Sequence, residues 1–330
     1  LKRLVLIAIP IVLGSLVNNV TSLIDVAMVQ GQLARALAKA PGYFETVYAG
    51  LISSEIEQNP AFDVMKDLPN SLYGCHRGYA FSIYNLVPVL TSVLGVSAIP
   101  VLATAWTKHD KAEVKSNIQT MLRTTAIIAI PAGLGIAALS HNILSLLYSD
   151  ENAINIAAPN LRILGICAVL SGLNAPIVSM LQAIGKQSVP LKNIAVGAVL
   201  KIIINFVLVG TPSINIVGVP IGTTVCYAYI CIANFICLVK HSGVMPNMMS
   251  VLIKPLFSGA VCAAAAFFAA RMLPKLIFSG NIVTVVSILL AALVYVIMLS
   301  LLRVVEREDI YSLPNGKKIA KVLAKFRIIR

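Results

Sequence analysis

Long runs of apolar residues, separated by short polar segments, occupy most of the chain. Eight runs hold mostly apolar positions over about twenty or more residues, the length that an α-helix needs to cross a bilayer. They cover residues 4–29, 81–106, 118–147, 161–184, 191–210, 217–239, 251–273 and 282–302. The pattern therefore predicts an all-α, polytopic transmembrane helical bundle of about eight spans within residues 1–302.

The first run carries a polar stripe. At 3.6 residues per turn, one helix face collects Gly14, Asn18, Thr21, Ser22 and Asp25. Asp25 is the only charge in this run, and a carboxylate inside a membrane span needs a partner or water. One interpretation places the stripe on a lined pathway or against a bound partner. The other places Asp25 near the outer end of the span, within reach of interfacial water.

Two segments lie outside the apolar runs. Residues 30–80 are too polar to span a membrane and too rich in apolar and aromatic residues to be plainly disordered. We expect an extracytoplasmic loop that caps the bundle, with short helices over 32–39 and 43–58 separated by Pro41 and Gly42. Residues 303–330 form a basic cytoplasmic tail, which is either an amphipathic helix on the anionic inner leaflet or a solvated tail.

Composition and charge narrow the class of protein. Hydrophobic residues make up 58% of the chain and the mean hydropathy is +0.89, which a soluble protein does not reach. The formal net charge is +13, but the basic residues gather at the N-terminus, in alternate short loops and in the tail, so we expect no nucleic-acid partner. The positive-inside rule places both termini in the cytoplasm, and an even number of spans requires the same. We therefore expect a multi-pass protein of the cell membrane.

Soluble-enzyme motifs are missing from the sequence. The six cysteines show no CxxC spacing, the four histidines are scattered, and no HExxH, P-loop or GxSxG pattern occurs. We expect no enzymatic activity, no metal and no cofactor.

Several charged residues fall at membrane depth. Lys201 lies in the middle of its run on an i, i+4 stripe with Asn193, Gly197 and Asn205, and a buried ammonium is costly unless it is paired. Arg77 opens the second run from the outer side, and Arg123 lies about 12 Å inward from Lys115 on the cytoplasmic side. Each arginine either snorkels to the interface or acts as a ligand for an anionic group.

Asp25 and Lys201 form a predicted charge pair, because Asp25 is the only formal charge in its run and Lys201 is the only one in the middle of its run. Their depths disagree, since Asp25 lies about 33 Å along its helix from Arg3 whereas Lys201 lies only about 14 Å from Lys192. Asn18 is the alternative partner for Lys201.

Three stretches carry a family resemblance. They are Ala8-Ile9-Pro10 with Leu13-Gly14-Ser15-Leu16 and Ile24-Asp25; Leu72-Tyr73-Gly74 with Gly78-Tyr79-Ala80, Asn85-Leu86-Val87-Pro88 and Leu90-Thr91; and Leu181-Gln182-Ala183-Ile184-Gly185-Lys186 with Pro190, Leu200-Lys201, Asn205, Gly218 and Gly222. In this order they resemble the C-terminal half of polysaccharide-transport flippases, in the branch of the stage V sporulation protein B-like proteins. The superfamily is that of the multidrug/oligosaccharidyl-lipid/polysaccharide exporters, and the eight runs correspond to its spans seven to fourteen.

The resemblance implies the C-terminal lobe of a two-lobe alternating-access transporter. Its substrate would be a polyprenyl-diphosphate-linked oligosaccharide or peptidoglycan precursor, so lipid-linked saccharide and membrane lipids are the expected partners. The chain begins at Leu1 and lacks the N-terminal lobe, so we expect a fragment that needs that lobe or a second copy to close a cavity. Some related flippases hold a cation between the helices that correspond to spans one, five and six, where Lys201 would replace the ion with a tethered charge.

Candidate substrate-binding or cavity-lining residues are Asn18, Asp25, Arg77, Asn85, Arg123, Lys201 and Asn205. Two alternative functions are a cation-coupled multidrug efflux antiporter of the same superfamily and a non-transporting membrane scaffold for envelope synthesis.

Overall fold

Helices make up the whole of the regular structure that is described. The computed structural model describes the backbone of residues 2–275 and 280–304, together with their side chains except those of residues 2–15, 17–21 and 275. In order, the elements are α1 (Lys2–Lys39), α2 (Pro41–Val47), α3 (Ala49–Gln58), α4 (Val64–Gly74), the π-helix η1 (Cys75–Ala80), α5 (Phe81–Tyr84), α6 (Leu86–Thr107), α7 (Lys111–Ala138), α8 (Ser140–Leu147), α9 (Glu151–Ala183), α10 (Ser188–Val209), η2 (Asn215–Val217), α11 (Gly218–Ser242), the π-helix η3 (Met249–Ile253), α12 (Lys254–Met272), η4 (Leu273–Lys275) and α13 (Gly280–Leu301).

Seven helical runs in the described part are long and apolar enough to cross a membrane. They are Val64–Thr107, Lys111–Ala138, Glu151–Ala183, Ser188–Val209, Asn215–Ser242, Met249–Met272 and Gly280–Leu301. The predicted first span, 4–29, falls within α1, where many side chains lie outside the described residues, and it stays a prediction. The predicted tail, 303–330, lies outside them as well, apart from its first two residues.

The segment predicted as a loop over 30–80 is largely helical: helices cover the predicted stretches 32–39 and 43–58, and residues 64–80 are helical as well, which was not predicted. α1 continues to Lys39, where Pro41 prevents its extension, and the second long helical run already begins at Val64. The physical reason is a satellite core: Leu33, Leu37, Phe44, Leu68 and Leu72 are all buried in one cluster. Alternating polar and apolar residues hid this amphipathic character, because hydropathy averages over both faces of a helix.

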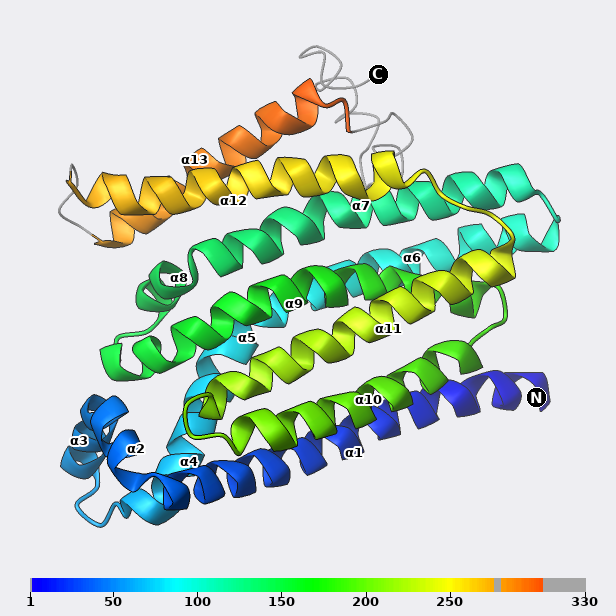
Figure 1. The fold of residues 1–330 in the computed structure, drawn as a ribbon. Helices are drawn as coiled ribbons and strands as arrows, with labels where there is room; N and C mark the ends of the chain where they lie inside the picture. The colour runs from blue at the N-terminus through cyan, green and yellow to red at the C-terminus, as the bar shows by residue number, and fades with distance from the viewer. Residues whose placement is uncertain (1, 276–279, 305–330) are drawn as a thin grey trace.

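Aspartate side chains fix the starts of three helices. Asp63, Asp110 and Asp150 have extended backbones and accept hydrogen bonds from backbone N–H groups in the first turns of α4, α7 and α9. Such caps satisfy donors that the first helical turn leaves free. The capped ends of α7 and α9 lie at opposite ends of the bundle, as Figure 1 shows.

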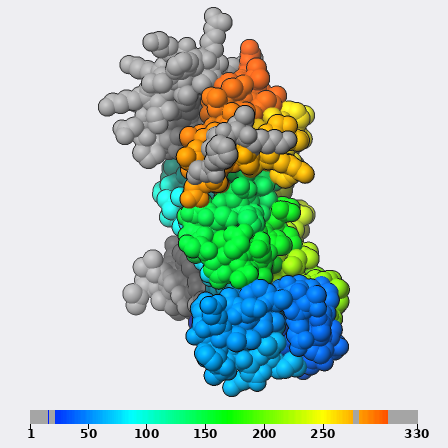
Figure 2. Space-filling view, turned by 90° about the vertical axis from the view of Figure 1, so that its left-hand side faces the viewer, coloured from blue at the N-terminus to red at the C-terminus, as the bar shows by residue number. Residues whose placement is uncertain are grey.

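The long helices lie side by side with α9 at the centre of the bundle (Figure 1). α10 and α11 pack with α1 on one flank, whereas α7, α12 and α13 form the other flank. The short helices α2 and α3 with the start of α4 cover one end, which Figure 2 views directly. Tyr48 ties this cap to the bundle, because its hydroxyl donates a 2.6 Å hydrogen bond to Asn215 Oδ1 ahead of α11.

Candidate functional site

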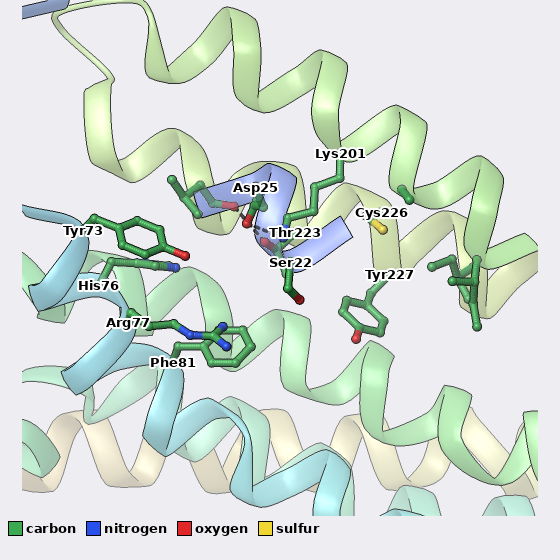
Figure 3. A pocket seen from close by; sticks show the side chains of 14 residues that line it. Ser22, Asp25, Tyr73, His76, Arg77, Phe81, Lys201, Thr223, Cys226 and Tyr227 are labelled. Carbon is green, nitrogen blue, oxygen red and sulfur yellow. Dashed lines mark hydrogen bonds and ion pairs between the residues drawn. The ribbon is translucent and has the colours of Figure 1, made fainter. Parts of the chain in front are cut away.

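A cavity of about 270 Å³ opens between α1, the helical run 64–107, α10 and α11. The side chains around it come from segments far apart in the sequence and point toward a common space (Figure 3). The polar and aromatic members of its lining are Ser22, Asp25, Tyr73, His76, Arg77, Phe81, Lys201, Thr223 and Tyr227. The cavity therefore combines the charged residue of α1 with that of α10.

An ion pair forms one wall of the cavity. Lys201 Nζ donates to Asp25 Oδ2 at 2.8 Å, and Asn205 Nδ2 donates to Asp25 Oδ1, also at 2.8 Å. The side chains of Asp25 and Lys201 are only 9% and 17% exposed. Both carboxylate oxygens thus have a donor, and the pairing offsets the cost of holding either charge away from water.

Close packing holds Asn205 in place. Asn205 is fully buried, and a Cβ built on Gly222 of α11 would collide with its Oδ1. Asn205 Oδ1 has no hydrogen-bond partner in the described part of the chain. Glycine at 222 therefore creates the space that directs the Asn205 amide toward Asp25.

Asp25 and Lys201 are in contact although their depths, counted along their helices from Arg3 and from Lys192, differ. α1 and α10 run in the same direction, and α1 begins well before the level at which α10 begins (Figure 1). Depths counted from Arg3 and from Lys192 therefore do not start from the same plane. The predicted pair of Asp25 and Lys201 is present. The side chain of Asn18, the alternative partner, lies outside the described residues.

Arg77 faces the ion pair from the other side of the cavity (Figure 3). It belongs to the π-helix η1, and its guanidinium carbon lies 4.1 Å from the centre of the Phe81 ring, a cation–π contact. Within the described residues Arg77 forms no ion pair, and its side chain is exposed. Among the lining residues two permanent cations, Arg77 and Lys201, thus accompany one carboxylate.

His76 is the buried neighbour of Arg77. It is 3% exposed, it stacks near Tyr73 and Phe81, and its Nδ1 has no hydrogen-bond partner among the described residues. π-helical turns are frequent at functional sites because the extra residue turns side chains away from the regular helical stripe. Here η1 places both His76 and Arg77 on the cavity.

Two predicted residues lie elsewhere. Arg123 does not line this cavity and does not snorkel: it is 1% exposed on α7, and its Nη1 donates to Ser250 Oγ of η3 at 3.1 Å. Asn85 is exposed at the break between α5 and α6 and is not among the lining residues. The prediction for Arg123 rests on its depth along the helix, which does not say which way a side chain points, and Asn85 was a candidate because it belongs to a stretch that carries the family resemblance.

Sequence reasoning missed several lining residues, namely Tyr73, His76, Phe81 and Tyr227. The first two lie in the segment predicted as a loop, ahead of the predicted start of the second span at 81. The short polar sequence Cys75-His76-Arg77-Gly78 next to an apolar run could have indicated these residues. No residue pattern, however, predicts the π-helical turn that this sequence forms.

Comparison with known proteins finds one family model and two membrane proteins that are similar to parts of this chain. Residues 77–207 match the MatE family model. The lipid II flippase MurJ of Bacillus subtilis is 24% identical over 160 residues, which are 48% of this chain and 29% of that protein. An uncharacterized membrane protein of Methanocaldococcus jannaschii is 24% identical over 152 residues, 46% of this chain and 29% of that protein. The matches thus span less than a third of the length of either relative.

A solved structure shares the fold. The structure titled lipid II flippase MurJ, inward closed conformation, superimposes with a TM-score of 0.54 at 19% identity, and the match covers 72% of this chain and 47% of that one. At this identity the likeness concerns the fold. Together, the MatE match over part of the chain, the similarity to the lipid II flippase MurJ and the seven apolar helical runs describe a multi-pass membrane protein with a MurJ-like fold.

Proposed function

We propose that the protein acts in flipping a polyprenyl-diphosphate-linked oligosaccharide or peptidoglycan precursor across the cytoplasmic membrane by alternating access. The observation that carries the proposal is the excess of positive charge in the cavity, where Arg77 and Lys201 accompany Asp25. A guanidinium matches phosphate oxygens in a bidentate geometry. Arg77 is therefore assigned to the diphosphate of the substrate.

The alternative function, cation-coupled efflux of drugs, needs a carboxylate that can take up and release a cation. Asp25 is the only acidic residue among those that line the cavity, and both of its oxygens already accept hydrogen bonds from Lys201 and Asn205. A cation would have to displace the lysine ammonium, which is tethered and therefore present at high local concentration. This arrangement favours an anionic substrate.

Alternating access also needs a surface that closes the pathway. Several large apolar residues of α6 are exposed, among them Leu86, Leu90 and Val93, on the span that continues from the cavity residues. We assign this face to an opposing lobe or to a second copy of the chain, and both termini to the cytoplasm. Transport itself is thus proposed for the assembled cavity and not for an isolated monomer.

Binding of defined lipids tests the proposal. Native mass spectrometry of the purified chain should show undecaprenyl diphosphate bound more tightly than undecaprenol, and both more tightly than ethidium. Arg77→Gln should weaken diphosphate binding about tenfold or more, the value of a charge-assisted hydrogen bond, and leave undecaprenol unchanged.

Arg162→Gln is the matched control, because Arg162 is an exposed arginine outside the cavity lining. Equal binding of diphosphate and alcohol, or an equal effect of the two arginine variants, contradicts the assignment of Arg77. Preferred binding of ethidium would favour the drug antiporter.

A further inference from the structure

A second polar cavity lies at the opposite end of the bundle from the α2–α3 cap. Its volume is about 260 Å³, near the lower limit of about 300 Å³ for small-molecule pockets, and it lies where α6 ends, α7 begins and α11 ends. The side chains that matter here are Trp106, His109, Lys111, Lys240 and His241. None of them takes part in the cavity around Asp25.

Positive charge at this pocket is not neutralised within the described residues. Lys111 and Lys240 are exposed, and neither forms an ion pair there. Oδ1 of the nearby Asp110 accepts hydrogen bonds from the backbone N–H groups of Ala112 and Glu113, and neither Asp110 nor Glu113 lines the pocket. Two ammonium groups from different helices thus approach one space, as an anion-binding site requires.

The histidines and the backbone are arranged around the same space. His241 Nδ1 lies 2.7 Å from the Cys237 carbonyl oxygen, so Nδ1–H donates to that carbonyl and Nε2 is left for another partner. His109 occupies a left-handed backbone conformation (φ 55°) in the turn between α6 and α7. A non-glycine residue in this conformation is uncommon and is often retained at a functional site.

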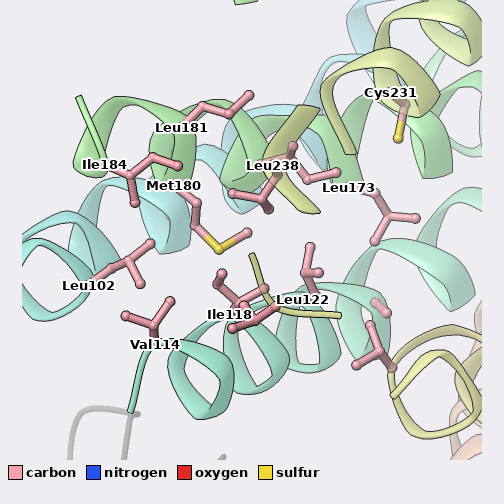
Figure 4. Close-up of a cluster of buried hydrophobic side chains, with 14 of the residues drawn as sticks. Leu102, Val114, Ile118, Leu122, Leu173, Met180, Leu181, Ile184, Cys231 and Leu238 are labelled. Atoms are coloured by element: carbon pink, nitrogen blue, oxygen red, sulfur yellow. The ribbon is translucent and has the colours of Figure 1, made fainter. Parts of the chain in front are cut away.

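The pocket rests on a rigid floor. Val114 lines it and is 2% exposed within the main core cluster, where Leu102, Ile118 and Leu238 pack together (Figure 4). These residues come from α6, α7 and α11, the same elements that supply the charged groups. The positions of Lys111 and Lys240 are therefore set by the packed core.

The position of the pocket points to a ligand with an apolar tail. Three membrane-spanning runs end here, and the only tryptophan of the chain, half-buried at this end, is a residue type enriched at the membrane–water interface. Val101 of α6 and Ile236 of α11, which precede the pocket residues Trp106 and Lys240 along their helices, are 54% and 58% exposed. A soluble anion would not contact these apolar side chains, whereas the acyl chains of a lipid would cover them.

We propose that this pocket binds the phosphate headgroup of an anionic phospholipid, with Lys111 and Lys240 as its cationic ligands and Trp106 beside the glycerol backbone. The acyl chains lie along the exposed faces of α6 and α11. Basic pockets between transmembrane helices are known to hold anionic headgroups in this way. The site is separate from the cavity around Asp25, so this proposal does not depend on the proposed flippase activity.

Trp106 provides a direct measurement, because it is the only tryptophan in the chain and it lines the pocket. The full chain is reconstituted in phosphatidylcholine vesicles, and its fluorescence is titrated with brominated phosphatidylglycerol or with brominated phosphatidylcholine. We expect several-fold stronger quenching by the brominated phosphatidylglycerol at equal mole fraction. Equal quenching by the two lipids overturns the proposal.

Matched variants locate the charge dependence. Replacing Lys111 and Lys240 together by Gln should abolish the several-fold preference for phosphatidylglycerol, because each lysine near an anionic lipid surface contributes about 1 kcal/mol. The control replaces Lys108 and Lys186, exposed lysines that do not line the pocket, and should keep the preference. An equal loss in both double variants would show only general surface charge and would overturn the assigned site.

Soluble phosphate is tested in parallel. Glycerol 3-phosphate at millimolar concentration should not change Trp106 emission in phosphatidylcholine vesicles. A lysine-dependent change with this compound, without preferential quenching by phosphatidylglycerol, would identify a soluble ligand and refute the lipid site. Because quenching is compared between two lipids within each variant, a moderate loss of stability does not imitate the expected result.

Discussion

At the scale of single residues, the Asp25–Lys201 pair shows how a charge is kept within a membrane span. Removing an ammonium and a carboxylate from water is costly, and their attraction repays this only with good geometry and further hydrogen bonds. Asn205 supplies such a bond to the second carboxylate oxygen, and Gly222 leaves the space for its amide. The site is thus a group of three side chains, in which Asp25 or Lys201 without its partner would leave an unpaired buried charge and destabilise the protein.

A double-mutant cycle tests this coupling. Asp25→Asn and Lys201→Gln should each lower the apparent melting temperature of the purified chain, because each leaves the partner charge buried without compensation. The double variant should recover part of this loss, with a coupling energy of about 1–3 kcal/mol.

Strictly additive effects would show that Asp25 and Lys201 act independently. Lys192→Gln, on the same helix but outside the cavity lining, is the control and should leave the melting temperature nearly unchanged.

At the scale of helices, the sequence predicts most of the long elements because hydropathy and length suffice for a membrane span. It predicts them less well where the helix is amphipathic, as at Leu68 and Leu72, or π-helical, as at His76 and Arg77. The predicted run 118–147 contains a break, because α7 ends at Ala138 and α8 begins at Ser140. The burial of Arg123 against Ser250 escaped prediction, because η3 is brought to α7 by the path of the chain between α11 and α12.

The packing of α7 on α9 depends on two glycines. A Cβ on Gly133 would lie 2.6 Å from the Gly165 carbonyl oxygen, and a Cβ on Gly165 would lie 2.6 Å from the Gly133 carbonyl oxygen. Close approach of small residues is a common way to pack helices in membranes. Gly133→Ala should therefore force α7 and α9 apart and cost about 1–3 kcal/mol of stability, read as a lower melting temperature.

Gly135→Ala is the matched control for this substitution. A Cβ on Gly135 meets nothing within 4 Å, so alanine there should be neutral or stabilising through its higher helix propensity. If both alanine variants melt alike, the glycine contact does not determine how closely the two helices pack.

At the scale of the whole molecule, the two ends of the bundle differ in charge. Lys108, Lys111, Lys186 and Lys240 lie in or next to the turns at one end, while the α2–α3 cap at the other end carries Glu45, Glu55 and Glu57. The tertiary structure therefore gathers on one end the basic residues that the sequence had only placed in alternate loops. By the positive-inside rule we propose that this end faces the cytoplasm.

Cysteine labelling in intact cells tests this orientation. Glu45→Cys, exposed on the cap, should react with a membrane-impermeant maleimide, whereas Lys186→Cys, exposed in the turn between α9 and α10, should react only after the membrane is permeabilised. The parental chain is the background control, because five of its six cysteines are buried and Cys237 is partly buried. The opposite labelling pattern would place the basic end outside, which contradicts the proposed orientation. It would leave the Asp25–Lys201 pair intact, since that contact is internal to the bundle and independent of which face is cytoplasmic.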